Sequence, residues 1–429
     1  MATTVNRRQA PPLVMPSYIR LPEPQHLPLL NGIPVFSFSK GQQEIVMIKW
    51  LFPAGAWQEP APQRAYLTSR MLKEGTQKHT AQALADAFEQ TGATLQISSK
   101  NNHAEIVVHT LNKHLPTVLP LVKEMLTESV FPEPELARIV ANTKQHLLVN
   151  AEKVETVADD RFKELLWGEK HPYGYRNKPE NFDNVTSQEL EQFYKTHYTA
   201  ENCHIYMAGK INDTHTQLIE HYFGGKDWLG NGRIADQDRP FAPFEPNKKE
   251  YVQKKDSLQA AIRIGRPLFN KTHPDYQGLF VLNTLLGGFF GSRLMSNIRE
   301  DKGYTYGIYS DLASYIKAGS FHIATEVNAD VREDAVREIF FEIERLCNDL
   351  VDEDELDLVR RYLLGTMLMQ HNTVFGTAAA VQGLLVYGLG IDFYAQFSET
   401  VRSITPQQLR NLAQQYLRPE QMLEVVAGN

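Results

Sequence analysis

Short apolar runs in this chain come in adjacent pairs, and groups of longer segments with helical periodicity separate the pairs. The runs typical of strands are residues 32–38, 44–52, 93–99, 104–110, 260–265, 306–312 and 320–327. The segments typical of helices are residues 80–91, 114–128, 133–152, 155–167, 272–286, 331–349, 353–370 and 374–388. Paired strands between groups of helices favour antiparallel pairing, so the pattern predicts an α+β fold rather than a doubly wound parallel sheet.

One stretch of the pattern occurs twice. Residues 185–209 and 404–428 align without a gap, and each reads as a helix, a turn and an apolar strand that ends at glycine. Thr186 and Thr405 are the expected N-caps, because a side-chain oxygen can accept from the free amides of the first turn. The identical pairs are Thr186/Thr405, Gln188/Gln407, Leu190/Leu409, Glu201/Glu420, Ala208/Ala427 and Gly209/Gly428.

The repeated unit closes each half of the chain, so we expect two similar domains. Their expected bounds are residues 1–225 and 251–429. The segment between them, residues 226–250, is rich in glycine, proline and charge, as linkers are. The alternative is a chance likeness between two helix–strand units.

Composition excludes some classes of protein. The net charge is −7 over 429 residues, and no dense basic cluster marks a nucleic-acid-binding surface. No apolar run approaches the ~20 residues that span a bilayer. The start, with Arg7 and Arg8, lacks the order of a secretory signal. We therefore expect a cytoplasmic protein, or a periplasmic or organellar one if a leader has been removed.

Cys203 and Cys347 are too few for a disulfide framework and are expected to pack in the core.

The sharpest motif is "LGGFFGSRLMSNIREDKGYTYGIYS" at residues 286–310, with "HPYGYR" at 171–176 in the first half. The order and spacing of these elements resemble the M16 (pitrilysin-type) zinc peptidases, and the likeness runs from residue 31 to the C-terminus. The resemblance implies two homologous domains of the LuxS/MPP-like metallohydrolase fold. Each would be a mostly antiparallel sheet backed by helices, and the two would face each other as a clamshell.

The stretch "QRAYLTSRMLKEGTQKHT" at 63–80 resembles the family's zinc-binding helix without its ligands. Active members carry H-x-x-E-H there: the histidines lie on one helical face and bind zinc, and the glutamate takes a proton from the metal-bound water. The following "MLKEGT" keeps the family's register. In that register Tyr66 and Arg70 stand at the histidine positions, and Ser69 stands at the glutamate position.

The family's third ligand, a glutamate about 75 residues further on by the resemblance, falls on Gln145 or His146. None of the 14 histidines are four residues apart, so no helical His pair could replace the lost one. We expect no zinc in this chain and no peptide hydrolysis by the chain alone. A metal site built from other residues remains the alternative at this stage.

The resemblance also implies a substrate-contacting pair in the second domain. Arg299 and Tyr306, seven residues apart, match an arginine and a tyrosine that bind the substrate backbone and stabilise its carbonyl oxygen. A guanidinium and a phenol can both donate hydrogen bonds to such an oxygen. Without the family, Arg299 would read as a helix C-terminal residue and Tyr306 as a strand aromatic.

Together these residues suggest a non-catalytic, substrate-binding subunit of a heteromeric M16-type peptidase. Its expected partner is a homologous subunit with intact H-x-x-E-H, which would hold the zinc, and its expected substrate is an extended peptide against a sheet edge. The alternatives are a structural subunit like the respiratory-complex core proteins, or a peptide-binding homodimer. We expect "EKHPYGYRN" at 169–177 and "DEDELD" at 352–357 to be surface features without chemistry.

Overall fold

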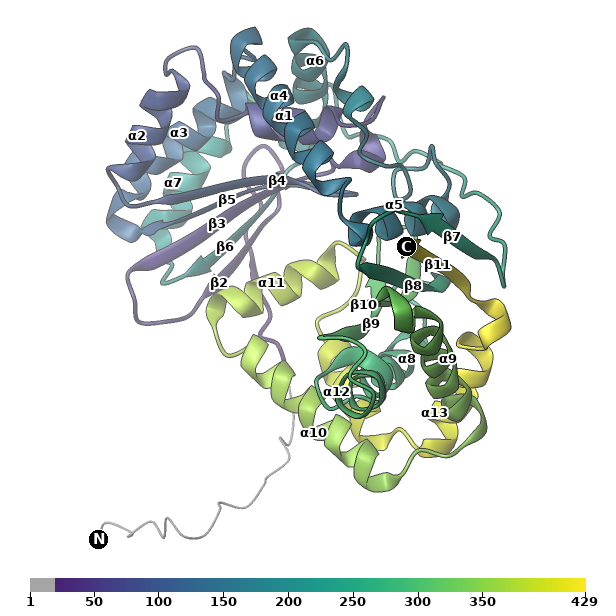
Figure 1. The fold of residues 1–429 in the computed structure, drawn as a ribbon. Helices are drawn as coiled ribbons and strands as arrows, with labels where there is room; N and C mark the ends of the chain where they lie inside the picture. Colours follow the sequence, from purple (N-terminus) through teal and green to yellow (C-terminus); the bar gives the residue numbers. More distant parts are fainter. Residues whose placement is uncertain (1–19) are drawn as a thin grey trace, which may run out of the picture.

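The computed structural model describes residues 20–429, and Arg7 and Arg8 lie outside this part. Two sheets form the framework, each with helices packed on it (Figure 1). The first sheet contains β1 (Gln25–His26), β2 (Val35–Ser39), β3 (Ile45–Phe52), β4 (Thr94–Ser99), β5 (Ala104–Leu111) and β6 (His204–Gly209). The second contains β7 (Lys249–Gln253), β8 (Gln259–Leu268), β9 (Ile308–Ser314), β10 (Gly319–Asn328) and β11 (Leu423–Gly428).

The helices also divide between the two halves. In the first half they are α1 (Arg64–Met71), α2 (Ala81–Glu89), α3 (Leu115–Thr127), α4 (Glu133–Asn150), α5 (Val154–Trp167), α6 (Ser187–His197) and α7 (Asp213–Phe223). In the second they are α8 (Tyr276–Asn283), α9 (Arg332–Asn348), α10 (Glu353–Gln370), α11 (Val374–Leu385), α12 (Phe393–Ser403) and α13 (Pro406–Tyr416). None of the helices within residues 20–429 combines the length and hydropathy that a bilayer crossing needs.

Both sheets have the same ladder. The order β2-β6-β3-β5-β4 in the first sheet recurs as β7-β11-β8-β10-β9 in the second, and β1 extends only the first. In each sheet the first pair of this ladder is parallel and the others are antiparallel. Thr186 and Thr405 cap α6 and α13 through the same capping box. The predicted α+β class and the duplicated helix–strand unit are therefore confirmed.

Each sheet buries one face against its own helices. In the first core, Trp50 and Phe52 of β3 meet Phe223 and Tyr198 at ring-centroid distances of 5.1 and 5.0 Å. In the second, Phe321 of β10 is buried in one cluster with residues of α9 and α13. Cys203 and Cys347 are free thiols buried in these cores, as expected.

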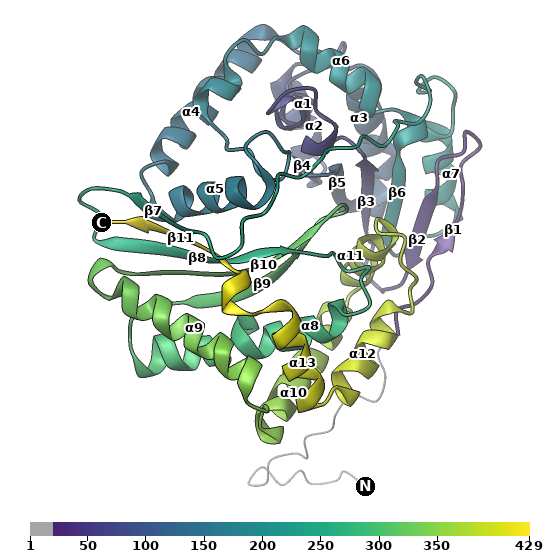
Figure 2. The same ribbon diagram turned by 90° about the vertical axis from the view of Figure 1, so that its right-hand side faces the viewer.

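The other face of each sheet is covered by a helix from the opposite half (Figure 2). Helix α5 belongs to the first half but packs on β8 and β11, where its Ala158 meets Ala261 and Ala427. Helix α11 belongs to the second half but packs on β2 and β6, with Val381 and other apolar residues against the first sheet. The two halves therefore complete each other through exchanged helices.

Two helix boundaries differ from the sequence pattern. The segment expected as a helix over 272–286 becomes helical only at Tyr276, because Pro274 disfavours helical backbone in the residue before it. Its C-terminal end passes into a π-helical turn, η5 (Thr284–Gly288). The stretch 63–80, which resembles a zinc-binding helix in sequence, is helical only from Arg64 to Met71 in α1, and the chain then turns at Gly75 with φ of 140°.

The expectation that "EKHPYGYRN" is a surface feature is wrong, because His171 to Gly174 are buried. A Cβ on Gly174 would lie 2.4 Å from the carbonyl oxygen of Gly168, so only glycine fits there. The segment belongs to an aromatic group at the junction of the halves, here called the junction cluster. Its members are Trp57, Trp167, His171, Tyr173, Phe241 and Tyr315. The acidic stretch 352–357 is mostly exposed, as expected, and starts α10.

The junction cluster makes an acid-sensitive contribution to stability. Burial lowers the pKa of His171 to about 4, and its Nδ1 accepts the backbone N–H of Tyr173. The unfolded chain binds this proton near pH 6.5. The contribution is complete above pH 6.5, and it falls by about 1.4 kcal/mol per unit as the pH drops from 6.5 towards 4. We expect urea unfolding at pH 7, 6 and 5 to show a shallower pH slope in His171→Asn, and equal slopes would contradict this.

Candidate functional site

Arg299 lies on a π-helical segment, η6 (Met295–Asp301), a form that is frequent at functional sites. Buried Met295 and Ile298 fix this segment on the second core. Just before it, Arg293 donates two hydrogen bonds of 2.8 Å to the carboxylate of Glu355 on α10. Because this fork-to-fork pair is planar and partly buried, it holds the start of η6 in one orientation.

The Arg299 side chain has no anionic partner within salt-bridge distance in residues 20–429. Its guanidinium instead lies over the ring of Phe290, 4.5 Å from the centroid. Phe290 comes from the glycine-rich stretch "LGGFFGSR" at residues 286–293 and is 63% exposed. A cation–π contact orients the guanidinium but leaves its N–H donors open, so Arg299 is ready to bind an acceptor.

Tyr306 is held out to solvent by a loop that two threonine hydroxyls brace. Thr305 Oγ1 donates to the Glu326 carbonyl at 2.7 Å and accepts the Gly307 amide at 3.1 Å. Thr325 Oγ1, on β10, donates to the Gly307 carbonyl at 2.9 Å. These bonds fix the backbone on both sides of Tyr306, whose own side chain is 96% exposed.

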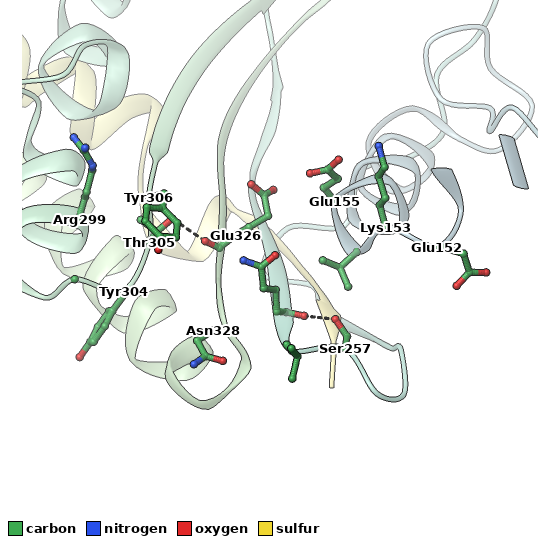
Figure 3. A pocket seen from close by; sticks show the side chains of 14 residues that line it. Glu152, Lys153, Glu155, Ser257, Arg299, Tyr304, Thr305, Tyr306, Glu326 and Asn328 are labelled. Carbon is green, nitrogen blue, oxygen red and sulfur yellow. Dashed lines mark hydrogen bonds between the residues drawn. The ribbon is translucent and has the colours of Figure 1, made fainter. Parts of the chain in front are cut away.

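Arg299 and Tyr306 line the same cavity, of about 990 Å³. Figure 3 shows them with Tyr304 and Thr305 on one side, here called the Arg299 wall. The opposite side is the segment 152–155, which leads into the first turn of α5 and is here called the α5 wall. The structure therefore brings the predicted pair to one wall, and it places a segment of the first half across from it.

The degenerate zinc positions lie on two helices that pack together, α1 and α4. Ser69 is buried, and its hydroxyl donates to the Tyr66 carbonyl at 2.7 Å. Arg70 is exposed at the end of α1. Gln145 and His146 are exposed on α4. The two helices that the resemblance assigns to a zinc site pack together, but of these five side chains only His146 is of a zinc-ligating type.

Zinc is held by Cys sulfur, His nitrogen or carboxylate oxygen. A phenol, a hydroxyl and a permanently charged guanidinium do not supply this set, so the residues of α1 do not fit a zinc ion. Within the described residues, no group of three or more His, Cys, Asp or Glu side chains is placed to hold a metal ion.

Comparison with known families matches both halves. The model "Insulinase (Peptidase family M16)" matches residues 35–173, and "Peptidase M16 inactive domain" matches residues 184–363. The chain belongs to the M16 peptidase family. The sequence-based recognition of this family is therefore confirmed.

Relatives of this M16 chain carry different descriptions. It is 24% identical over 307 residues to "Uncharacterized zinc protease YmxG" of Bacillus subtilis, covering 71% of this chain and 73% of the relative. It is 19% identical over 373 residues to "Non-peptidase homolog YmxG" of Helicobacter pylori, covering 85% and 84%. These identities are low, and so the activity of this M16 homologue has to be argued from its own residues.

Solved structures share the fold of this M16 chain. A "peptidase M16 inactive domain" from Pseudomonas fluorescens superposes with a TM-score of 0.86 at 23% identity, covering 94% of this chain and 98% of that one. The periplasmic protease PqqL from Escherichia coli gives 0.79 at 16% identity, covering all of this chain but 48% of that one. This M16 homologue thus corresponds to about half of PqqL.

Several residues of this candidate site were not predicted from the sequence. Phe290 under Arg299, and the threonines that brace the Tyr306 loop, were not singled out. Arg263 on β8 was also missed, although it stands inside the apolar run "AAIRIG". A charge in the middle of a buried strand needs a partner, and this signal could have identified it.

Proposed function

We propose that this chain is the non-catalytic, substrate-binding subunit of a heteromeric M16-type zinc peptidase that acts on peptides or unfolded polypeptides. The supporting observation is the contrast between its two halves. The first half has no zinc donors on α1, whereas the second presents Arg299 and Tyr306 with free donor groups at one cavity. Residues without an internal partner at a cavity are available for a ligand.

The chain's own residues would bind and orient the substrate. The Arg299 guanidinium has five N–H donors and the Tyr306 phenol has one, and both can donate to the carbonyl oxygen of a peptide. Such donors stabilise the negative charge that develops on that oxygen during peptide hydrolysis. A partner subunit with H-x-x-E-H would supply the zinc and the general base. The partner and the substrate are both part of this proposal.

Reconstitution tests the proposal. The chain is purified from its source cells without chelators, and co-purifying proteins are searched for an M16 homologue with H-x-x-E-H. Hydrolysis of reduced, carboxymethylated α-lactalbumin is then measured for each subunit alone and for the mixture. We expect activity only in the mixture, and zinc only in the partner. Full activity of the partner alone would overturn the proposal.

A purely structural subunit is the second candidate. It is favoured by the name of the Helicobacter pylori relative, a "Non-peptidase homolog". In that case the chain would enter an assembly that has no peptidase activity, and variants of Arg299 would change nothing measurable.

We further propose a cytoplasmic location. Cell fractionation checks it against the periplasm, the compartment named for PqqL.

A further inference from the structure

A buried arginine next to the cavity contacts both halves, and one of its partners, Glu326, lines the cavity. Arg263 on β8 is 3% exposed. Its Nε donates to Asp159 at 2.6 Å, and its Nη2 lies 2.9 Å from the carboxylate of Glu326. Its Nη1 donates to the carbonyl oxygens of Ile262 and Thr325 at 3.0 and 3.3 Å. The guanidinium therefore uses all three of its nitrogens.

The two carboxylates lead to the two walls of the cavity. Asp159 lies on α5, about one helical turn after Glu155, the last residue of the α5 wall. Glu326 lies on β10, and its backbone carbonyl accepts the Thr305 hydroxyl that braces the Tyr306 loop. The path Asp159–Arg263–Glu326–Thr305 thus runs from one wall to the other.

The charges make this path stiff. A buried guanidinium that loses a carboxylate partner is costly, so the fully paired arrangement is strongly preferred. The side chains of Asp159 and Glu326 are 45% and 34% exposed, and so they can be hydrated if released. The planar fork of arginine holds both partners at fixed angles, which an ammonium group would not.

We propose that Arg263 is a positioning residue that sets the width of the cavity by tying the α5 wall to the Arg299 wall. The inference rests on the proposed function in one respect, namely that the cavity receives the peptide. Arg263 itself touches no substrate. It acts by holding Tyr306 and the start of α5 at one separation, so that an extended chain meets a preformed site.

The test uses Asp159→Asn rather than a variant of Arg263, because losing the buried guanidinium could prevent folding. Asn keeps the shape and removes the charge. Asp160→Asn is the matched control, since Asp160 neighbours Asp159 on α5 but has no contact with Arg263. Asp159→Glu keeps the charge and should rescue.

Two readouts are measured. Spin labels at Glu155→Cys and Asn328→Cys report the width of the cavity, because both positions line it and the native Cys203 and Cys347 are buried from the reagent. Affinity for fluorescein-labelled, carboxymethylated α-lactalbumin is measured on the unlabelled full chain. We expect Asp159→Asn to broaden the distance distribution and to weaken binding about tenfold. Asp160→Asn should match the parent, and Asp159→Glu should restore a narrow distribution.

An unchanged distance distribution in Asp159→Asn would overturn the proposal that Arg263 sets the width of the cavity, whatever the effect on binding. If the distribution broadens while the parent chain shows no affinity for the polypeptide, the tie is supported and the proposed function is overturned. The two ideas therefore fail on separate readouts.

Discussion

Replacing Arg299 with alanine is expected to lower kcat/KM of the reconstituted complex by about 100-fold or more, the loss typical of a removed oxyanion donor. The guanidinium would contact the carbonyl oxygen most strongly when its charge has developed, so kcat should fall more than KM rises. Assembly should not change, because Arg299 makes no ion pair within the described chain. Steady-state kinetics and size-exclusion chromatography measure the two effects.

Two variants control this experiment. Arg337→Ala removes a cation on α9 whose one ion-pair partner within residues 20–429 is Asp334 and which does not line the cavity, and it should leave turnover unchanged. Tyr306→Phe removes only the phenol hydroxyl of a residue that is 96% exposed. It should lower kcat by less than Arg299→Ala does. Equal turnover for Arg299→Ala and Arg337→Ala would favour the structural candidate over the proposed function.

Trp167→Ala is expected to cost about 3–5 kcal/mol of the free energy of unfolding, the range for truncating a buried aromatic. Trp167 is 2% exposed and its ring lies 5.4 to 6.0 Å from those of Phe241, Tyr315 and Tyr173. These partners come from the first half, the linker and the second half, so the loss weakens the junction itself. Urea unfolding should change from one transition to two as the halves uncouple.

Phe341→Ala is the control for Trp167→Ala. Phe341 is an aromatic residue of α9 that is 51% exposed, so its removal should cost well under 1 kcal/mol. A single transition in Trp167→Ala with a small loss of stability would show that the junction cluster does not couple the halves.

Much of the fold follows from local patterns. The capping threonines, the apolar strand ends and the glycine after each unit repeat at fixed spacing, and they form the same helix–strand unit in both halves. The burial of "HPYGYR" was not foreseeable in the same way. Its histidine, tyrosines and arginine read as polar, and only the assembled junction supplies the rings and carboxylates that they contact.

The site was predicted in part. The seven-residue spacing of Arg299 and Tyr306 does not itself place their side chains together. The family resemblance predicted them as a pair, and in the structure both line one wall of the cavity. The tie through Arg263 could not be predicted, because its partner Asp159 lies 104 positions earlier on a helix of the other half. An ion pair of this kind depends on how α5 crosses the second sheet, which no local pattern records.

The exchange of α5 and α11 has a consequence for the origin of the chain. Each half packs one helix on the sheet of the other half: α5 on the second sheet and α11 on the first. The two helices occupy equivalent places in the repeat that also relates the two ladders. This is the arrangement of a domain-swapped twofold dimer whose two copies have been fused end to end. In a dimer of single halves, identical sequences would have had to satisfy both surfaces at once. In one fused chain the two halves are free to differ, and here the first has no zinc donors on α1 while the second presents Arg299 and Tyr306 at a cavity.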